Sequence, residues 1–149
     1  MSEYRGVGRW YPPESGTDLW YSRALADAAS RTVDPTLRQR VWAQSLEAAA
    51  RATEVSEDRH NAYYNLAVFY STQGDLARSE QALSAAIQCA PNWYKPHWLS
   101  AEGFLLSGKL DSASREAQSA IDLNGQDRWE LRDTLQRIRV KQGSPSPSP

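Results

Sequence analysis

The feature of this sequence that most restricts its fold is an internal repeat with a period of 34 residues. When the chain is shifted by one period, small, aliphatic and glycine residues coincide: Ala67 with Ala101, Gly74 with Gly108, Leu76 with Leu110, Ala86 with Ala120 and Ile87 with Ile121. Large rings also correspond, since Tyr64 meets Trp98 and Tyr70 meets Phe104. A period of this length is typical of stacked supersecondary units, each of which buries its apolar face against the next.

The hydrophobic pattern within this period predicts helices. Apolar residues recur with helical spacing and predict the buried stripes of three helices, through Trp42 and Leu46, through Tyr63, Leu66 and Tyr70, and through Leu131, Leu135 and Ile138. The 20 alanines favour helices that approach one another closely. Asp34 followed by Pro35 predicts a helix start, and Gly74 and Gly143 predict helix ends. We predict seven helices, at about 18–31, 34–54, 59–73, 75–90, 96–107, 110–123 and 128–142. The expected fold is all-α, a right-handed stack of about three antiparallel helix pairs and a C-terminal capping helix.

The residues of the repeat resemble those of the tetratricopeptide repeat (TPR) family. In residues 60–93, the positions that match a TPR unit are Tyr63, Leu66, Ala67 and Tyr70 in the first helix, Gly74 at the turn, Ser79, Leu83 and Ala86 in the second helix, and Pro91 at the end. Residues 94–127 resemble a second unit that departs from the pattern at His97, Ser100, Ala117 and Gly125. Residues 18–54 resemble a divergent unit, and residues 128–142 a polar cap.

The two ends of the chain differ in composition from the repeat. Residues 1–16 combine three glycines and two prolines with aromatic residues, which predicts an irregular, aromatic-rich leader that lies against the first helices. Residues 17–142 are expected to form one TPR-like helical domain, with its clear units at 60–93 and 94–127. The last residues, 143–149, read GSPSPSP and are expected to be disordered.

A narrower resemblance concerns three segments: YPPESGTDLWYSRAL, EDRHNAYYNLAVFY and APNWYKPHW. They resemble the C-terminal TPR segment of bacterial O-antigen ligase or polymerase-like membrane proteins. In that family a multi-spanning, glycosyl-transferring portion precedes the repeats, and its catalytic residues have no counterparts here. The resemblance implies a soluble accessory segment, cytoplasmic or on the soluble side of an envelope protein. The residues themselves do not define a compartment.

Composition excludes several other classes of function. The 17 basic and 18 acidic residues leave a net charge of −1 without a basic cluster, so we expect no nucleic-acid partner. No apolar run reaches the ~20 residues that cross a bilayer, so this chain should not insert directly into a membrane. The single cysteine, Cys89, is expected to be a small buried hydrophobe.

Catalysis and cofactor binding are not expected. The two histidines, His60 and His97, have no metal-ligand partner at helical spacing, so no metal site is predicted. His97 falls at a core-facing position, which favours a hydrogen-bonded packing role over acid–base chemistry. No serine lies in a nucleophile-elbow pattern, and the glycines at the start of the chain do not form a phosphate loop. We therefore expect a protein that is not an enzyme and needs no cofactor.

The TPR resemblance implies a binding surface, because the first helix of each pair lines the concave face in that family. Matching positions give Asn61, Tyr64, Asn65, Val68 and Thr72 from one unit, and Lys95, Trp98, Leu99, Glu102, Leu105 and Leu106 from the next. These residues predict an aromatic and aliphatic groove for a protein or peptide segment. Asn65 and Lys95 match two positions of a clamp for a peptide C-terminal carboxylate, but Leu99 and the divergent first unit do not support it.

Other interpretations remain open at this stage. Trp93 and Trp98 lie in the densest aromatic run and either pack the junction between units or form an anchor pocket, because Trp and Tyr dominate binding hot spots. The repeats could instead self-associate, as a homodimer, or brace a larger protein without a separate ligand. A glycan-binding accessory domain is a third interpretation.

Overall fold

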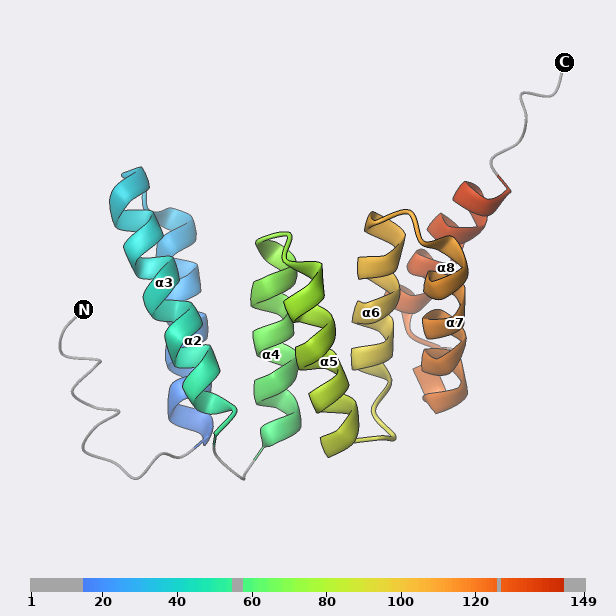
Figure 1. The fold of residues 1–149 in the computed structure, drawn as a ribbon, viewed down its shortest axis with the longest axis horizontal. Helices are drawn as coiled ribbons and strands as arrows, with labels where there is room; N and C mark the ends of the chain where they lie inside the picture. The colour runs from blue at the N-terminus through green and yellow to red at the C-terminus, as the bar shows by residue number, and fades with distance from the viewer. Residues whose placement is uncertain (1–14, 55–57, 126, 144–149) are drawn as a thin grey trace, which may run out of the picture. The chain divides into compact units, whose positions relative to one another are not determined.

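A computed structural model describes residues 15–54, 58–125 and 127–143. This part of the chain is entirely helical and contains no strand, as predicted (Figure 1). Its elements are α2 (Ser15–Arg31), α3 (Pro35–Ala52), α4 (Arg59–Thr72), α5 (Leu76–Cys89), α6 (Tyr94–Leu106), α7 (Leu110–Ala120), the π-helical turn η1 (Ile121–Gly125) and α8 (Trp129–Gln142). Helices α2–α7 form three antiparallel pairs, and α8 follows them.

The chain divides into two compact units, one that ends at Cys89 and one that begins at Ala90. The first unit contains the pairs α2–α3 and α4–α5, and the second contains the pair α6–α7 with η1 and α8. Each unit has its own buried core. The expectation that residues 17–142 behave as one domain stays a prediction.

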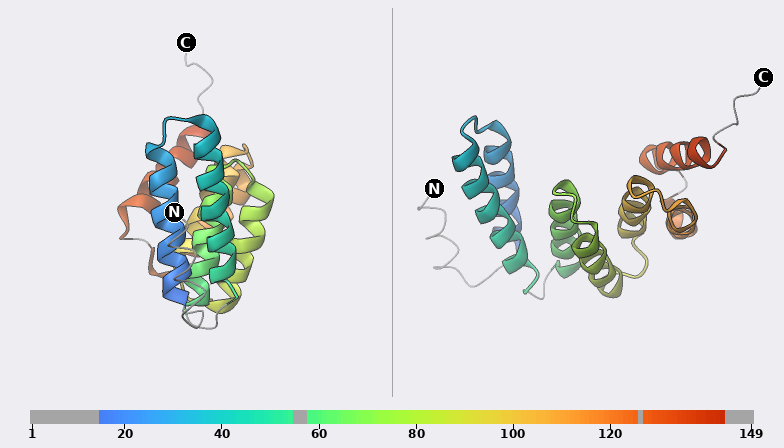
Figure 2. Two further views of the ribbon diagram at one scale, coloured as in Figure 1. Left: turned by 90° about the vertical axis from the view of Figure 1, so that its left-hand side faces the viewer. Right: turned by 45° about the horizontal axis from the view of Figure 1, so that its top comes forward.

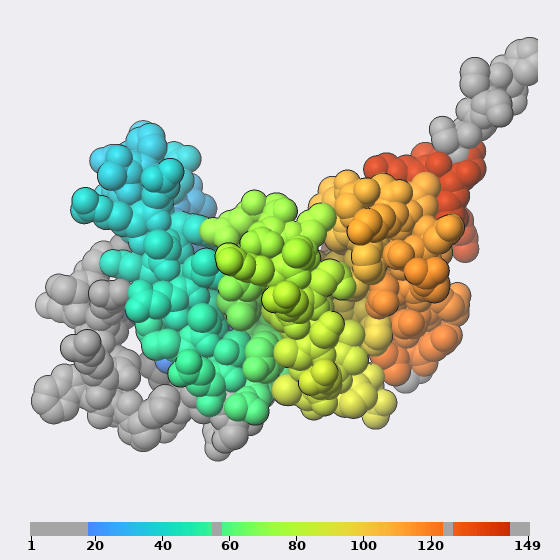
Figure 3. All heavy atoms as spheres, viewed as in Figure 1, coloured from blue at the N-terminus to red at the C-terminus, as the bar shows by residue number. Residues whose placement is uncertain are grey.

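In the first unit, small side chains let α2 and α3 pack closely. Ser22, Ser45 and Ala48 are fully buried, and the Ser45 hydroxyl donates a 2.7 Å hydrogen bond to the Ser22 carbonyl. Leu25 and Val41 add apolar burial to the same pair. The next helix packs directly onto this pair, and the atoms of α3 and α4 meet in the space-filling view (Figure 3).

The pair α4–α5 is closed by the small residues of the repeat. Ala67 on α4 and Ala86 on α5 are fully buried, beside the buried Leu83. The Ser79 hydroxyl donates to the Ala67 carbonyl at 2.9 Å, so this buried polar group has a partner across the pair. Such contacts require short side chains on both helices, which explains why the repeat preserves them.

In the second unit, α8 packs against both helices of the α6–α7 pair (Figure 2). Three fully buried alanines of α7, among them Ala113 and Ala117, allow the neighbouring helices to approach it. Leu131 and Ile138 of α8 enter the same core, which also includes Leu105 of α6. Burial of this stripe holds the final helix in place, and most of its remaining residues are polar and exposed, apart from Trp129 and Val140.

The turns inside α4–α5 and α6–α7 are copies of one another. Gly74 has φ +79° and Gly108 has φ +74°, a left-handed conformation that favours glycine. The residue after each glycine donates its N–H to a carbonyl five residues back, Asp75 to Tyr70 and Lys109 to Phe104, both at 2.9 Å. These are Schellman turns, and both glycines lie where the sequence predicted helix ends.

Several predicted details differ from the structure. Helix α2 begins three residues before its predicted start, and α6 begins at Tyr94 rather than near Pro96. Pro96 is the third residue of α6, where a missing N–H leaves no helical bond unmade. Helix α7, which corresponds to the predicted helix at 110–123, ends at Ala120, and the chain continues as the π-helical turn η1. The Asp34 cap is confirmed, because its carboxylate accepts from the Thr36 and Leu37 N–H groups.

The prediction that Cys89 is buried is wrong. Cys89 is the last residue of α5 and is exposed, because the closely packed part of this helix ends at Ala86. The irregular leader lies almost entirely outside the described residues, although Ser15 and Gly16 belong to α2. The predicted disordered tail also lies outside them, except for Gly143, which ends α8.

Candidate partner-binding cavity

The first unit contains a cavity of about 360 Å³ that opens between α2 and α4. Its walls are supplied by Arg23 and Ala26 of α2, Trp42 of α3, and Tyr64, Asn65, Val68, Phe69 and Thr72 of α4. Most of this lining is apolar. Its volume lies at the lower end of the range for ligand pockets, about 300–1,000 Å³, so it suits one large side chain with its adjoining backbone.

Two rings support the apolar side of the cavity. The centroids of Trp42 and Phe69 lie 5.2 Å apart with the rings tilted by 53°, a favourable arrangement for an aromatic pair. Phe69 is 5% exposed, so it belongs to the core as well as to the cavity wall. The Trp42 Nε1 is buried and has no hydrogen-bond partner within the described residues. An unpaired buried donor lowers the stability of the fold.

Asn65 connects the cavity wall to α2. It is buried, its Oδ1 accepts from Arg23 Nε at 3.2 Å, and its Nδ2 donates to the Ser22 hydroxyl at 3.1 Å. The Ser22 hydroxyl in turn donates to the Leu19 carbonyl at 2.7 Å. Asn65 therefore holds α2 against α4 and orients Arg23, instead of presenting a free amide.

Among the described residues, Arg23 is the one cation that lines the cavity. Its guanidinium carbon lies 5.5 Å from the centroid of the Trp20 ring, within cation–π range, and its Nε is held by Asn65. Within the described part of the chain, Arg23 has no carboxylate partner. An arginine held on two sides but without an acid is well placed to meet an acceptor from another molecule.

Of the five residues predicted on α4, four line this cavity: Tyr64, Asn65, Val68 and Thr72. Asn61 is half-buried and is not part of the lining. The sequence did not place Arg23, Ala26, Trp42 or Phe69 on the binding surface. Because the pair α2–α3 departs from the repeat, its residues could not be placed by matching positions, and no local signal identified them.

The residues predicted on α6 have different surroundings in the second unit. Lys95 is exposed, Leu99 is half-buried and Leu106 is 70% exposed. Leu105 is only 2% exposed and belongs to the core with Leu131, so it is a packing residue. Trp98 and Glu102 take part in contacts with α8.

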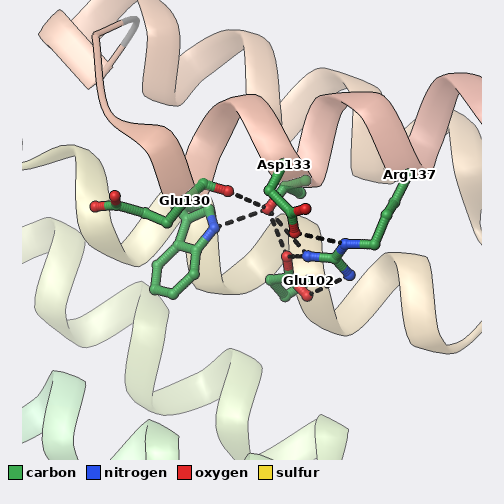
Figure 4. Close-up of polar contacts among 6 residues, drawn as sticks. Glu102, Glu130, Asp133 and Arg137 are labelled. Atoms are coloured by element: carbon green, nitrogen blue, oxygen red, sulfur yellow. Dashed lines mark hydrogen bonds and ion pairs between the residues drawn. The ribbon is translucent and has the colours of Figure 1, made fainter.

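These contacts form a polar network between α6 and α8 (Figure 4). The Trp98 Nε1 donates to the Thr134 hydroxyl at 2.9 Å, and that hydroxyl bonds to the Glu102 carboxylate. Arg137 reaches across to the same carboxylate and also pairs with Asp133 at 2.9 Å. Trp98 therefore packs a helix junction in this unit. A role for Trp98 in partner binding stays a prediction.

Contacts between α6 and α8 shift the pKa values of Tyr94, Glu130 and Arg137. Burial, and then the hydrogen bond to Glu130, raise the pKa of the Tyr94 phenol above its ordinary value. The hydrogen bond from Tyr94, 2.6 Å long, lowers the pKa of the Glu130 carboxyl. The Glu102 carboxylate raises the pKa of Arg137, which stays protonated. These groups hold the final helix in place at neutral pH.

Other chemistry-bearing groups lie outside the cavity. The His97 Nδ1 lies 2.8 Å from Glu116 Oε2, which gives this half-buried ring a hydrogen-bond partner on the neighbouring helix. Among residues 15–54, 58–125 and 127–143, no three His, Cys, Asp or Glu side chains are grouped to hold a metal ion. None of the helices in these ranges is long and apolar enough to cross a bilayer.

The fold is that of a TPR protein. The structure is similar to the crystal structure of a thermophilic TPR protein from Thermus thermophilus, with a TM-score of 0.74 and 18% sequence identity. The match covers 95% of this chain and 70% of that chain. At this identity the likeness establishes the fold alone. No family model matches the sequence, and no curated protein matches it.

Proposed function

We propose that this protein is a non-catalytic interaction scaffold that binds a peptide or protein segment in an aromatic and aliphatic groove. The cavity between α2 and α4 would be the first anchor of that groove. The observation that carries the proposal is the coincidence of four predicted binding residues with the lining of this cavity. The TPR-type fold supports it, because stacked helix pairs commonly present extended surfaces to other proteins.

The physical basis is an open apolar space beside ordered polar groups. Val68 is 38% exposed at the cavity, while Phe69 beneath it is almost fully buried. A partner side chain could displace water from apolar wall without disturbing the core, which is how anchor pockets contribute most of their affinity. The predicted α6 residues belong to the second unit and stay a separate candidate contact region.

Val68→Trp tests the proposal, because a large ring at this position would fill the cavity. Ala77→Trp is the matched control, since Ala77 lies outside the cavity on α5. Partner proteins captured from the native organism are identified, purified and titrated against each variant. We expect the Ala77→Trp variant to bind like the wild type and Val68→Trp to bind at least about tenfold more weakly. Unchanged affinity of the Val68→Trp variant would refute the cavity as the anchor.

The resemblance to O-antigen ligase or polymerase-like proteins would place the partner in envelope glycan assembly. It rests on the three quoted segments and receives no support from comparisons with known families. The sequence that precedes this chain in its gene tests it directly. A multi-spanning apolar region there supports the assignment, and a second soluble domain contradicts it.

Self-association is the main alternative use of the same surface. In that case a second copy would occupy the groove, and a homodimer would be the functional form. Light scattering over a dilution series distinguishes the two. A mass that stays at one chain throughout would exclude the homodimer and leave the separate partner.

A further inference from the structure

We propose that the cavity of the first unit selects a segment in which an aromatic side chain stands next to an acidic side chain. The aromatic ring would fill the apolar part, and the carboxylate would bind Arg23. This inference rests on the proposed function and adds the chemistry of the partner. It commits to a side-chain carboxylate within a peptide chain.

The charge of the cavity wall is complementary to an acidic ligand. Helix α4, which supplies most of the cavity wall, contains no Asp or Glu. On α2, Asp18 and Asp27 are already paired with Arg51 and Arg31, at 3.2 and 2.6 Å. Arg23 therefore carries a positive charge that no acid of the described residues neutralises. An acidic side chain from a partner would complete this pattern.

Most polar groups of the cavity wall already have hydrogen-bond partners. Asn65 already uses both ends of its amide, and the Thr72 hydroxyl donates to the Val68 carbonyl at 2.8 Å. Among the described residues of the wall, the terminal N–H groups of Arg23 are donors without a partner, whereas the unpaired Trp42 Nε1 is inaccessible to solvent. A wall with unpaired N–H donors and no unpaired carboxylate suits a ligand that supplies oxygen acceptors.

The Arg23 side chain is oriented before a ligand binds. The Trp20 ring lies on one side of its guanidinium, and Asn65 holds its Nε. Arginine carries considerable rotamer entropy, so a guanidinium that is already oriented loses less freedom on binding. This arrangement favours a specific contact over a diffuse attraction.

The test uses three peptides, each with an acetylated N-terminus and an amidated C-terminus. Their central residues are Glu-Phe-Glu, Gln-Phe-Gln and Glu-Ala-Glu, each flanked by two alanines on either side. The full chain, labelled with ¹⁵N, is titrated while the indole N–H signal of Trp42 and the Nε–H signal of Arg23 are followed. The amidated end removes the terminal carboxylate, so any acidic preference comes from side chains.

We expect the Glu-Phe-Glu peptide to bind about two- to fivefold more tightly than Gln-Phe-Gln, as for an ion pair near the surface. The Glu-Ala-Glu peptide should bind more weakly than either. In the Arg23→Gln variant the ratio between Glu-Phe-Glu and Gln-Phe-Gln should fall to one, while Arg23→Lys should keep part of it. Arg40→Gln removes the same charge from an exposed site on α3 and should keep the full ratio.

Four results would overturn the inference. Equal binding of Glu-Phe-Glu and Gln-Phe-Gln at Trp42 would leave the cavity as a binding site but remove its acidic preference. A preference that persists in Arg23→Gln would assign the charge contact elsewhere. Movement of the Trp42 signal on dilution of the peptide-free protein would make a second copy the occupant. If no peptide shifts Trp42, the acidic inference fails, and the Val68→Trp titration decides the proposed function independently.

Discussion

At the residue scale, several equivalent positions of the two repeat copies have the same degree of burial. Ala67 and Ala101 are both fully buried, and Tyr64 and Trp98 are both half-buried. On α3, however, the stripe predicted through Trp42 and Leu46 is displaced by one residue, since Val41 and Ser45 face the core. Small residues occupy the positions where backbones meet, and large ones flank them, so size decided which face was buried.

The same displacement changes which aromatic residue of α4 stabilises the fold. The sequence placed Tyr70 in the core, but Tyr70 is half-buried beneath Arg78, and Phe69 is buried against Trp42. Phe69→Ala should cost about 3–5 kcal/mol of unfolding free energy, as for other large-to-small core changes. Tyr70→Ala should cost about 1 kcal/mol. Urea unfolding of both variants measures the difference, and equal costs would contradict this assignment.

A second prediction concerns the pH dependence of the Tyr94–Glu130 contact. The pKa of Glu130 is lowered by folding, so its contribution is present above the ordinary carboxyl value of 4.5 and is lost as the pH falls through the folded value. The pKa of Tyr94 is raised, so its contribution is complete below 10.0 and is lost as the pH rises through the folded value.

Urea midpoints across the pH range should therefore fall at both extremes. Glu130→Gln should reduce the acid-side decrease, and Tyr94→Phe should reduce both decreases relative to the wild type. Because Glu130 is exposed to solvent, the effects should be small and should weaken in high salt. An acid-side decrease of the same size in Glu130→Gln and wild type would assign it to other carboxyl groups.

At the scale of the element, the polar network explains how α8 is held. The sequence predicted its apolar stripe correctly at Leu131 and Ile138, but it did not predict the fully buried Thr134 between them. A threonine on an apolar stripe gives no local sign of a partner. Its partners Trp98 and Glu102 lie 36 and 32 residues away in the chain, so only the packing of α8 on α6 reveals the contact.

Thr134→Val tests the contribution of this network, because valine keeps the shape of threonine and removes the hydroxyl. The partly buried Trp98 N–H and the Glu102 carboxylate would each lose a hydrogen-bond partner, at a cost of about 1–3 kcal/mol. Thr134→Ser keeps the hydroxyl and should cost about 0.8 kcal/mol for the lost methyl group. Amide exchange in α8 should accelerate more in Thr134→Val. If valine were harmless, burial alone would hold the helix.

At the scale of the whole molecule, two of the helix pairs, α4–α5 and α6–α7, reuse one unit of sequence. The hydrogen bonds of the turn after α4 recur one period later after α6, although few residues are identical. The TPR-type fold is consistent with this recurrence, because stacked repeat units are each built from the same local contacts. Equivalent substitutions in the two copies should therefore have equivalent effects.

Gly74→Ala and Gly108→Ala test this equivalence. No atom lies within 4 Å of a Cβ built at either glycine, so the cost comes from the left-handed backbone alone. We expect each substitution to lower the unfolding free energy by about 1 kcal/mol. Gly74→Asn and Gly108→Asn should cost less, because asparagine tolerates this conformation better. Costs that differ greatly between the two alanine variants would mean that the turns are not energetic copies.

The sequence by itself determined the helices, their turns and the copied unit, because these depend on interactions between near neighbours. A helical period, a capping Asp34 and glycines at Gly74 and Gly108 act over a few residues. Only the tertiary structure decided the cavity between α2 and α4. Its wall depends on contacts such as the bond between Arg23 and Asn65, which are 42 residues apart, and no local pattern specifies how two distant helix faces meet.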